Sequence, residues 1–467
     1  MEATRTADVV IVGAGIIGLA CALELAQCGT TVTLIGPRTG QHLGQASRAA
    51  GAMLTVFSEV EAAHPPERVA VEVAERIAAR VGYEAWLDQL TAVGGRLVAL
   101  TPGVWVTAST PADRTELAAI ADAAAGAGVP GELHSPGDVP GLVSETVFEA
   151  LWLPGEAGVD AEALTGSATA AVLAHPRISW LDTDTDAVAV TEASSAMRIA
   201  TAADLTVTAE QVVLAAGVQI PTLLRHSPEL ELGAPPVLAG RGVSMVLDAA
   251  PAPVASPIRT PNRGFACGAH LVARTDGGLY LGATNRLSTL PVLDRRPSID
   301  EIATLLHDAT CELNADLRHA QIRGARVGYR PYTTDHLPLV GRTAHPKVLL
   351  ATATYRCGML LAPHVARLLQ REVDHPGALL DHPYSPRRSI QTTATTELLT
   401  AHGPALADVI CQPGGSLPAG APAVLGRLLC AALAHQLADP ATQRLAASAP
   451  VEEVLPLLLD VAGRTTR

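Results

Sequence analysis

The chain has 467 residues and a formal net charge of −13, with 48% hydrophobic and 17% charged residues. This length favours two domains with a further segment, and the apolar content is typical of a folded core rather than of a disordered chain. The acidic balance argues against a nucleic acid as the main partner, because a protein that binds a polyanion needs an excess of cations.

Cysteine usage and hydropathy indicate a cytoplasmic protein without a membrane segment. The seven cysteines are scattered with no short spacing typical of a zinc site, so we expect reduced thiols and no metal site. The uncharged stretch 9–23 is shorter than the roughly 20 apolar residues of a membrane span, and the stretch 409–426 is interrupted by prolines and glycines. The N-terminus lacks the apolar core of a secretory signal.

The first expected element is a strand–helix–strand unit, which predicts an α/β fold. Residues 9–12 are a β-branched run typical of a buried parallel strand, and a glycine turn follows at once. Residues 16–26 carry apolar side chains at helical spacing, and residues 31–35 are expected to form the second strand.

The remaining elements are predicted from periodicity and from turn residues. Helices are expected at 65–94, 115–125, 164–173 and 299–313. Strands are expected at 178–181, 187–190 and 205–207, as a small antiparallel segment, and at 211–215, 242–287 and 348–352. After about residue 382 the composition changes to a Pro/Gly hinge at 413–422, followed by helical periodicity over 425–436.

The glycine turn has the spacing of a dinucleotide-binding site. In Gly13-x-Gly15-x-x-Gly18, the first glycine permits the tight turn, the second lets a pyrophosphate approach the backbone, and the third lets the helix pack on the strand. The N-terminus of the helix offers free N–H groups to an anion. The carboxylate that usually binds the ribose is absent, because the second strand ends in Ile35-Gly36. Two interpretations of Arg38 remain open: contact with a phosphate or adenine, and a solvated loop arginine.

Four later motifs have residues suited to contact with a flat ligand. The run 46–54 is rich in small residues, which let the backbone approach a ligand or pack tightly. The others are a strand ending in small residues at 212–217 and the segments 328–338 and 351–363. The last two present an arginine beside an aromatic residue, Arg330 with Tyr329 and Arg356 with Tyr355.

These five motifs, in this order, resemble the D-amino-acid-oxidase family of FAD-dependent oxidoreductases, and within it the glycine oxidase (ThiO-like) branch. The resemblance covers roughly residues 7–380. It implies a Rossmann-type FAD-binding domain made of residues 1–90, 150–235 and 325–384. It also implies an interleaved antiparallel-sheet substrate domain made of residues 91–149 and 236–324. Residues 385–467 have no counterpart in the family fold and are expected to form a helical C-terminal extension.

The resemblance implies non-covalent FAD. The residues expected to bind it are Gly13, Gly15, Ile16, Ile17, Gly18, Ile35, Gly36, Arg38, Gln45, Ala46, Ala50, Gly51, Ala52, Met53, Ala187, Val188, Ala216, Gly217, Tyr355, Arg356, Gly358, Met359 and Leu360. Among them, the backbone N–H groups of Gly358, Met359 and Leu360 are expected near the pyrimidine carbonyls of the flavin.

The resemblance also implies roles for four side chains. Arg330 is expected to pair with the substrate carboxylate, and Arg356 to lie at the substrate entrance or at the carboxylate. His270 takes the place of an active-site tyrosine, with a core histidine as the alternative. Tyr332 is expected to line the pocket, with simple packing as the alternative.

The activity that the resemblance implies is oxidation of the C–N bond of a small amine that bears a carboxylate. FAD takes a hydride from the carbon next to the nitrogen, O2 is reduced to H2O2, and the imine hydrolyses. Departures from the family pattern in the pocket motifs, namely His270, Thr354 and Cys357, favour a substrate larger than glycine, such as an N-substituted glycine. Two alternatives remain open: a dehydrogenase that passes electrons to a partner, and a non-catalytic flavoprotein scaffold. We expect the C-terminal extension to cover the flavoprotein body and to contribute to a homo-oligomer, with partner docking as the alternative.

Overall fold

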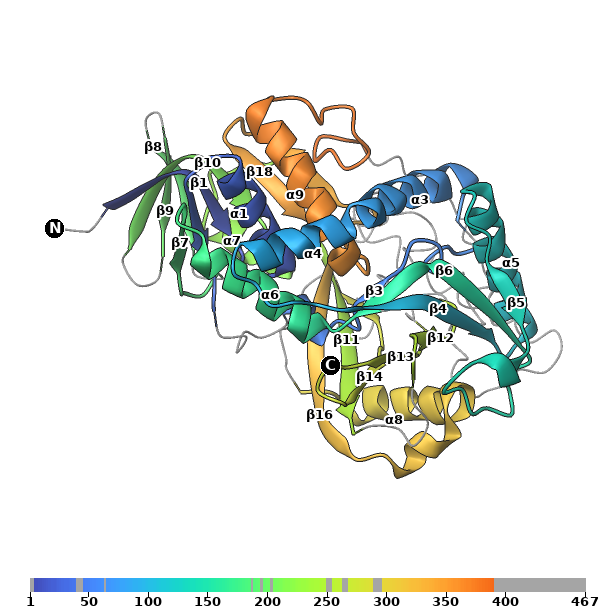
Figure 1. Ribbon diagram of the computed structural model, residues 1–467. Helices are drawn as coiled ribbons and strands as arrows, with labels where there is room; N and C mark the ends of the chain where they lie inside the picture. Colours follow the sequence, from blue (N-terminus) through green and yellow to red (C-terminus); the bar gives the residue numbers. More distant parts are fainter. Residues whose placement is uncertain are drawn as a thin grey trace, which may run out of the picture.

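Two β-sheets organise the chain, with helices packed mainly around the first (Figure 1). The structure is a computed structural model that describes residues 4–38, 45–62, 64–185, 188–193, 196–201, 205–248, 254–262, 268–288 and 296–389. The hinge at 413–422 and the helical periodicity at 425–436 therefore lie outside the described residues.

The first sheet has the strand order β17-β18-β10-β1-β2-β7, and its centre is parallel. Its strands are β1 Thr4–Val12, β2 Val32–Ile35, β7 Ile178–Leu181, β10 Thr206–Leu214, β17 Leu339–Arg342 and β18 Val348–Thr352, with β8 Ala189–Ala193 and β9 Ala196–Ala200 joined to β10 through β9. Strands β8, β9 and β17 run antiparallel to their neighbours. The strand–helix–strand unit predicted at the start of the chain is confirmed.

The prediction that 178–181 belongs to an antiparallel segment is wrong, because β7 pairs in parallel with β2. Helix α6 Ala161–Ala174 leads from β6 Glu149–Val159 of the second sheet into β7, so a long excursion of the chain through that sheet separates β7 from β2. The strands expected at 205–207 and 211–215 are one continuous strand, β10.

Both faces of the parallel sheet are buried, as the alternation of side chains along β1 shows. Val9 and Ile11 belong to a core shared with the helices α1 Ile16–Gln27 and α9 Gly358–Asp374. Val10 and Val12 belong to a second core, shared with β9 and α7 Ile220–Arg225. Helix α1 packs against α9 and α6, so this helical layer fixes where the N-termini of α1 and α9 lie.

The second sheet has the order β15-β11-β14-β13-β12-β4-β6-β3, with β16 on β11 and β5 on β6. Its strands are β3 Met53–Leu54, β4 Leu100–Ala108, β5 Glu132–His134, β6 Glu149–Val159, β11 Leu238–Leu247, β12 Ile258–Arg259, β13 His270–Ala273, β14 Leu279–Gly282, β15 Arg286–Ser288 and β16 Ile322–Tyr332. The pairs are antiparallel except for β4 with β12. The domain boundaries expected from the sequence stay a prediction; β6 and β16 hydrogen-bond in this second sheet.

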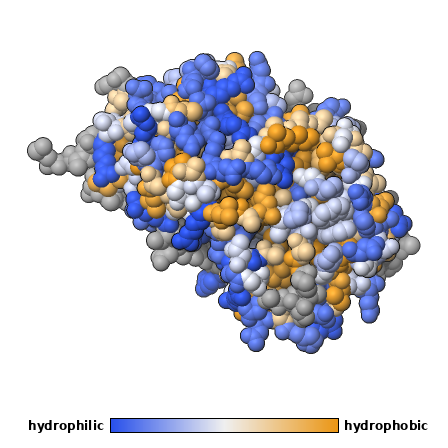
Figure 2. Space-filling model, viewed as in Figure 1, coloured by the Kyte–Doolittle hydropathy of each residue, from blue (hydrophilic) through white to orange (hydrophobic). Residues whose placement is uncertain are grey.

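The predicted helices are confirmed, with two breaks. Residues 65–94 form two helices because the chain turns at Gly82, and 299–313 ends in a π-helical turn. The helices and helical turns not yet given are α2 Ala46–Ala49, α3 Pro66–Val81, α4 Tyr83–Ala92, α5 Pro111–Gly126, α8 Ile299–Asp308, η1 Pro136–Asp138, η2 Gly217–Gln219, η3 Ala309–Leu313 and η4 Ala315–His319. Within the ranges that the structure describes, no helix is both long and apolar enough to span a membrane. On the face shown in Figure 2, apolar residues lie in patches among hydrophilic ones.

Candidate active site

A cavity of about 190 Å³ lies where the parallel strands of the first sheet end against the second sheet. Its wall includes the residues that follow β1 and β10 and the end of β18. Strands β11, β13, β14 and β16 of the second sheet supply the opposite side. In doubly wound α/β folds, ligands bind at the carboxyl ends of the strands, which is where this cavity lies.

Most of the residues predicted from the sequence are brought together here. The wall includes Gly13, Gly15, Ile16, Ile17, Gln45, Ala46, Ala50, Gly51, Ala52, Met53, Ala216, Gly217, His270, Arg330, Tyr355, Arg356, Gly358 and Met359. The described wall does not include Gly18, Ile35, Gly36, Arg38, Val188, Tyr332 or Leu360. Ala187 lies outside the described residues.

The glycine turn is shaped by residues that lie beneath it. Gly13 has φ +121° and its N–H donates to the carbonyl of Ile35 at 2.8 Å. A Cβ on Gly13 would lie 2.4 Å from the backbone of Ala215, and a Cβ on Gly18 would lie 1.8 Å from the carbonyl oxygen of Gly13. Gly18 and Ile35 therefore support the turn from behind, while Gly13 and Gly15 face the cavity.

Two helix N-termini are part of the cavity wall. Helix α1 contributes Ile16 and Ile17, and helix α9 contributes Gly358 and Met359. Neither helix has an acidic residue in its first turn. The Ile16 N–H already donates to the Ser47 hydroxyl at 3.0 Å. The partial positive charge of each helix end is therefore available to an anionic or electron-rich group in the cavity.

Unpaired polar atoms and strained backbone mark the same cavity. The buried Gln45 Oε1 and Thr352 Oγ1 have no hydrogen-bond partner among the described residues, and both residues line the wall. Ala52 and Tyr355 line it with positive φ, at 51° and 46°. Buried polar atoms are nearly always hydrogen-bonded, and strain concentrates at functional sites, so both features fit a polar ligand.

Arg38 contacts protein groups rather than the cavity. Its guanidinium lies 5.6 Å from the centre of the Trp180 ring and donates to the Trp180 carbonyl at 3.0 Å. Its backbone N–H donates to Asp182 at 2.9 Å. Pro37 and Thr185, which the sequence analysis did not single out, line the cavity in this part of the chain.

Arg330 brings a positive charge to the wall that no described carboxylate compensates. Its Nη1 donates to the carbonyl of Thr284 at 3.1 Å and to Asn285 Oδ1 at 3.0 Å. The guanidinium lies over Gly242, where a Cβ would be 2.3 Å from Nη1. No ion pair joins Arg330 to a carboxylate within the part of the chain that the structure describes. A half-buried guanidinium that has no carboxylate partner among the described residues is suited to bidentate binding of a ligand carboxylate.

Arg356 lies in the same wall, but carboxylates of the protein compensate its positive charge. Its Nη1 is 3.1 Å from Glu61 Oε1 and 3.5 Å from Glu59 Oε2. Glu59 also pairs with the fully buried Arg259. Burial alone would raise the pKa of Glu59, but the positive charges of Arg259 and Arg356 outweigh burial and hold this pKa at about 2. Glu59 is therefore ionised, and Arg356 is engaged by carboxylates of the protein.

His270 is a neutral hydrogen-bonding group at the cavity. Its ring stacks on Tyr280 at 5.5 Å, and its Nδ1 lies 3.2 Å from the carbonyl of Gly268, which makes Nδ1 the protonated nitrogen. A Cβ on Gly51 would lie 2.4 Å from Nε2, which places Nε2 beside the small-residue run. Burial, together with the charge of Arg259, lowers the pKa of His270 to about 3. Nε2 therefore accepts hydrogen bonds at neutral pH.

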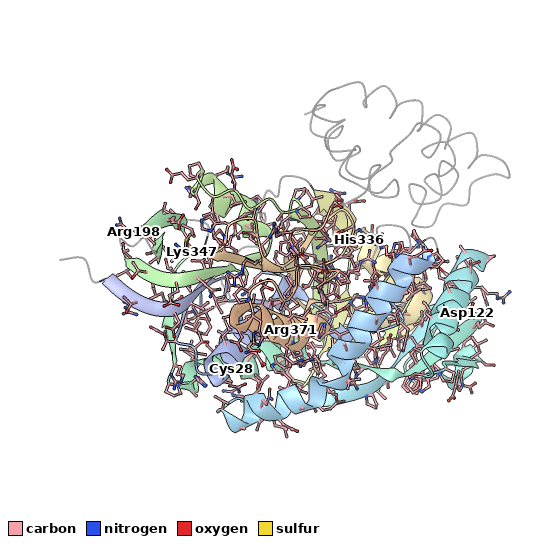
Figure 3. The ribbon with its side chains drawn as sticks, turned by 90° about the horizontal axis from the view of Figure 1, so that it is seen from above. Cys28, Asp122, Arg198, His336, Lys347 and Arg371 are labelled. Atoms are coloured by element: carbon pink, nitrogen blue, oxygen red, sulfur yellow. The ribbon has the colours of Figure 1, made fainter. Side chains whose placement is uncertain are left out.

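Tyr332 lies behind the wall. It is fully buried, and its ring centre is 5.3 Å from that of Tyr355 and 5.8 Å from that of His336. Seen from above, His336 lies between Arg198 at one end of the molecule and Asp122 at the other (Figure 3). The expectation that Tyr332 lines the pocket is not supported by this placement, because the ring of Tyr355 packs against it and lines the cavity itself.

Sequence reasoning missed the carboxylates Glu59 and Glu61 and the residues Arg259 and Asn285. The two glutamates lie a few residues after the small-residue run 46–54, which is the one local signal for them. Their arginine partners are 200 and 295 residues away in the sequence, so no local pattern connects them.

Comparisons with known proteins agree with this geometry. The model of the DAO family, described as FAD dependent oxidoreductase, matches residues 8–371. The glycine oxidase of Geobacillus kaustophilus is 29% identical over 405 residues, which cover 83% of this chain and 98% of that protein. The bifunctional protein ThiO/ThiG of Synechocystis sp. is 28% identical over 405 residues, which cover 83% of this chain and 55% of that protein. The crystal structure of the Geobacillus kaustophilus glycine oxidase superimposes with a TM-score of 0.70 at 27% identity, covering 83% of this chain and all of that one.

Proposed function

Because the chain belongs to the DAO family of FAD-dependent oxidoreductases, we propose that it oxidises the C–N bond of a small amine that bears a carboxylate, such as an N-substituted glycine. The observation that carries this proposal is Arg330, a guanidinium in the cavity wall without a carboxylate partner among the described residues. A substrate carboxylate bound there leaves the amine end of the substrate in the cavity.

The residues present fit FAD. The glycine turn and the N-terminus of α1 suit its pyrophosphate, the run 50–53 suits its flat ring system, and the N-terminus of α9 suits its electron-rich pyrimidine edge. The buried Gln45 Oε1 and Thr352 Oγ1, which have no hydrogen-bond partner among the described residues, can form hydrogen bonds with a bound cofactor. No cysteine is among the described residues of the wall, which supports non-covalent binding. When bound, FAD accepts a hydride from the carbon beside the amine nitrogen.

The protein's own residues bind and orient the substrate in this proposal. Arg330 holds the carboxylate, and Asn285 fixes the Arg330 guanidinium through the hydrogen bond to Nη1. His270, neutral and with Nε2 free of a proton, accepts a hydrogen bond from the amine N–H and so orients the amine in the cavity. Oxygen as the electron acceptor, a cytoplasmic location and a homo-oligomer remain parts of the proposal.

Anaerobic mixing with a panel of amines tests the proposal. We expect N-methylglycine to bleach the flavin absorbance. N-methylethylamine, in which a methyl group replaces the carboxylate of N-methylglycine, should leave the absorbance unchanged. Admission of O2 should restore the absorbance and produce H2O2. Equal bleaching by both amines would show that Arg330 does not bind a substrate carboxylate. Bleaching by no amine in the panel would favour a non-catalytic scaffold. Bleaching that O2 fails to reverse would point to a dehydrogenase.

A further inference from the structure

Two arginines share the cavity wall and are joined by a short chain of hydrogen bonds. Arg330 Nη1 donates to Asn285 Oδ1 at 3.0 Å, and Asn285 Nδ2 donates to the Tyr355 hydroxyl at 2.7 Å. Arg356 Nη2 donates to the same hydroxyl at 3.2 Å, and its guanidinium carbon lies 4.8 Å from the centre of the Tyr355 ring. The two guanidinium groups are therefore held at a defined spacing beside one cavity.

The surroundings of the two arginines differ in charge. Arg330 contacts a carbonyl and an amide, whereas Arg356 contacts Glu59 and Glu61. Glu59 divides its charge between Arg259 and Arg356. Glu61 is the nearer partner of Arg356; it also accepts from Asn262 and lies 3.5 Å from His64 Nε2, and burial lowers the pKa of His64, which favours the neutral imidazole. Arg356 and Glu59 are each 8% exposed in their side chains and Glu61 is 17% exposed, so bulk water screens these charges weakly.

We propose that Glu61 is a specificity-determining residue, which restricts the substrate to a single carboxylate by pairing with Arg356. This inference rests on the proposed function. A substrate with a second carboxylate would bring that group next to Arg356 and Glu59, which line the cavity, while Glu61 pairs with Arg356 from the adjoining pocket. There it would lose hydration and meet like charges, because Arg356 is already paired. A substrate whose second end is apolar or neutral avoids this repulsion.

Binding of two non-oxidisable ethers tests the inference on the FAD-loaded protein. Methoxyacetate and oxydiacetate are the ether counterparts of N-methylglycine and iminodiacetate, and they differ in one carboxylate. We expect the wild-type protein to bind methoxyacetate about ten-fold or more tightly than oxydiacetate by titration calorimetry. Glu61→Gln removes the charge but keeps a side chain able to contact Asn262, now 3.1 Å from Glu61 Oε1. This substitution should shift the ratio toward oxydiacetate by about ten-fold or more.

The control is Glu84→Gln, which removes a glutamate that pairs with Arg80 at 2.7 Å on the exposed face of α4, away from the cavity. It should leave the ratio unchanged. Kinetics gives the second readout: Glu61→Gln should raise the kcat/KM for iminodiacetate relative to N-methylglycine in the same direction. Adding Arg356→Gln to Glu61→Gln should abolish this gain.

The outcomes separate this inference from the proposed function. If the wild-type protein binds oxydiacetate as tightly as methoxyacetate, or binds neither, the inference is wrong whatever the variants do. It is also wrong if N-methylglycine is oxidised but Glu61→Gln leaves the binding ratio unchanged. If no amine reduces the flavin while Glu61→Gln still shifts the ratio, the inference on Glu61 stands and the proposed oxidation does not.

Discussion

At the scale of single residues, Arg330 and Arg356 carry the same charge in different settings. Among the described residues, Arg330 contacts only neutral acceptors, whereas two glutamates compensate Arg356. Electrostatic context, rather than residue type, is therefore what supports our proposal that Arg330 binds the substrate carboxylate. Both arginines stand beside an aromatic residue in the sequence, so the local pattern alone does not separate them.

Replacement of Arg330 by lysine tests this assignment. A lysine forms a single contact where the guanidinium forms two, so substrate binding should weaken by about 1.5–3 kcal/mol, or about ten- to a hundred-fold. FAD binding should change little. Arg326→Lys on the same strand is the control, because Arg326 pairs with Glu162 and does not line the cavity. An unchanged KM for every accepted amine would show that Arg330 has a structural role only.

The lowered pKa of His270 predicts that the free energy of unfolding depends on pH. Its pKa is lowered from 6.5 to about 3, so the folded state takes up a proton less readily than the unfolded chain. The stability that this neutral histidine contributes is complete above about pH 6.5 and is lost as the pH falls toward 3. Between pH 7 and pH 5 the loss should be on the order of 1–2 kcal/mol. In His270→Gln, urea unfolding should show a smaller decrease over this interval; an identical decrease would contradict the prediction.

At the scale of elements, the turn between β1 and α1 is the part of the site that a single substitution should abolish. A side chain on Gly15 would begin 3.3 Å from the Ser47 hydroxyl and extend where the N-terminus of α1 faces the cavity. Gly15→Leu should therefore yield a folded protein without bound FAD. Gly166→Leu, at an exposed helical position with open space around it, should keep the yellow colour. Flavin absorbance and circular dichroism measure both, and a yellow Gly15→Leu protein would refute the assignment.

At the scale of the whole molecule, the last described residues contact the segment that follows Arg330 and Tyr332 in the sequence. Arg388 Nε lies 2.7 Å from Asp335, and Nη1 donates to the carbonyl of Pro338 at 2.7 Å. Burial opposes ionisation of Asp335, but Arg388 holds its pKa below the ordinary value. Residues 385–389, which the sequence analysis assigned to the extension, thus contact the segment that leads from β16 to β17.

Two truncated chains, one with and one without Arg388, test whether the Arg388–Asp335 ion pair stabilises the fold. A chain that ends at residue 389 should retain FAD, since the described residues of the cavity wall all precede residue 360. A chain that ends at Tyr384 should also bind FAD but lose about 1–3 kcal/mol of stability, because Asp335 would lose its partner. Thermal unfolding and flavin absorbance measure both, and light scattering tests the expected role of the tail in a homo-oligomer. A colourless protein ending at 389 would show that the tail takes part in cofactor binding.

The secondary structure at the start of the chain could be predicted from the sequence because it depends on residues that are close together in the sequence. The β-branched run at 9–12, the glycine spacing of the turn and the helical period of 16–26 each depend on neighbours within one element. They determined the strand–helix–strand unit, and the order of five motifs determined the family, both of which are confirmed. Cofactor chemistry followed from these, because a pyrophosphate site needs only a tight turn and a helix N-terminus.

Tertiary structure alone decided which charges are compensated. Glu61 and Arg356 are 295 residues apart, and Glu59 and Arg259 are 200 apart, yet each pair meets in a space that water screens weakly. The parallel position of β7 and the burial of Tyr332 behind Tyr355 likewise depend on which elements pack together. Pairing in a folded protein depends on distance in space, which local periodicity does not encode. For this reason the sequence identified both arginines, and only the fold showed that carboxylates of the protein compensate Arg356 but, among the described residues, not Arg330.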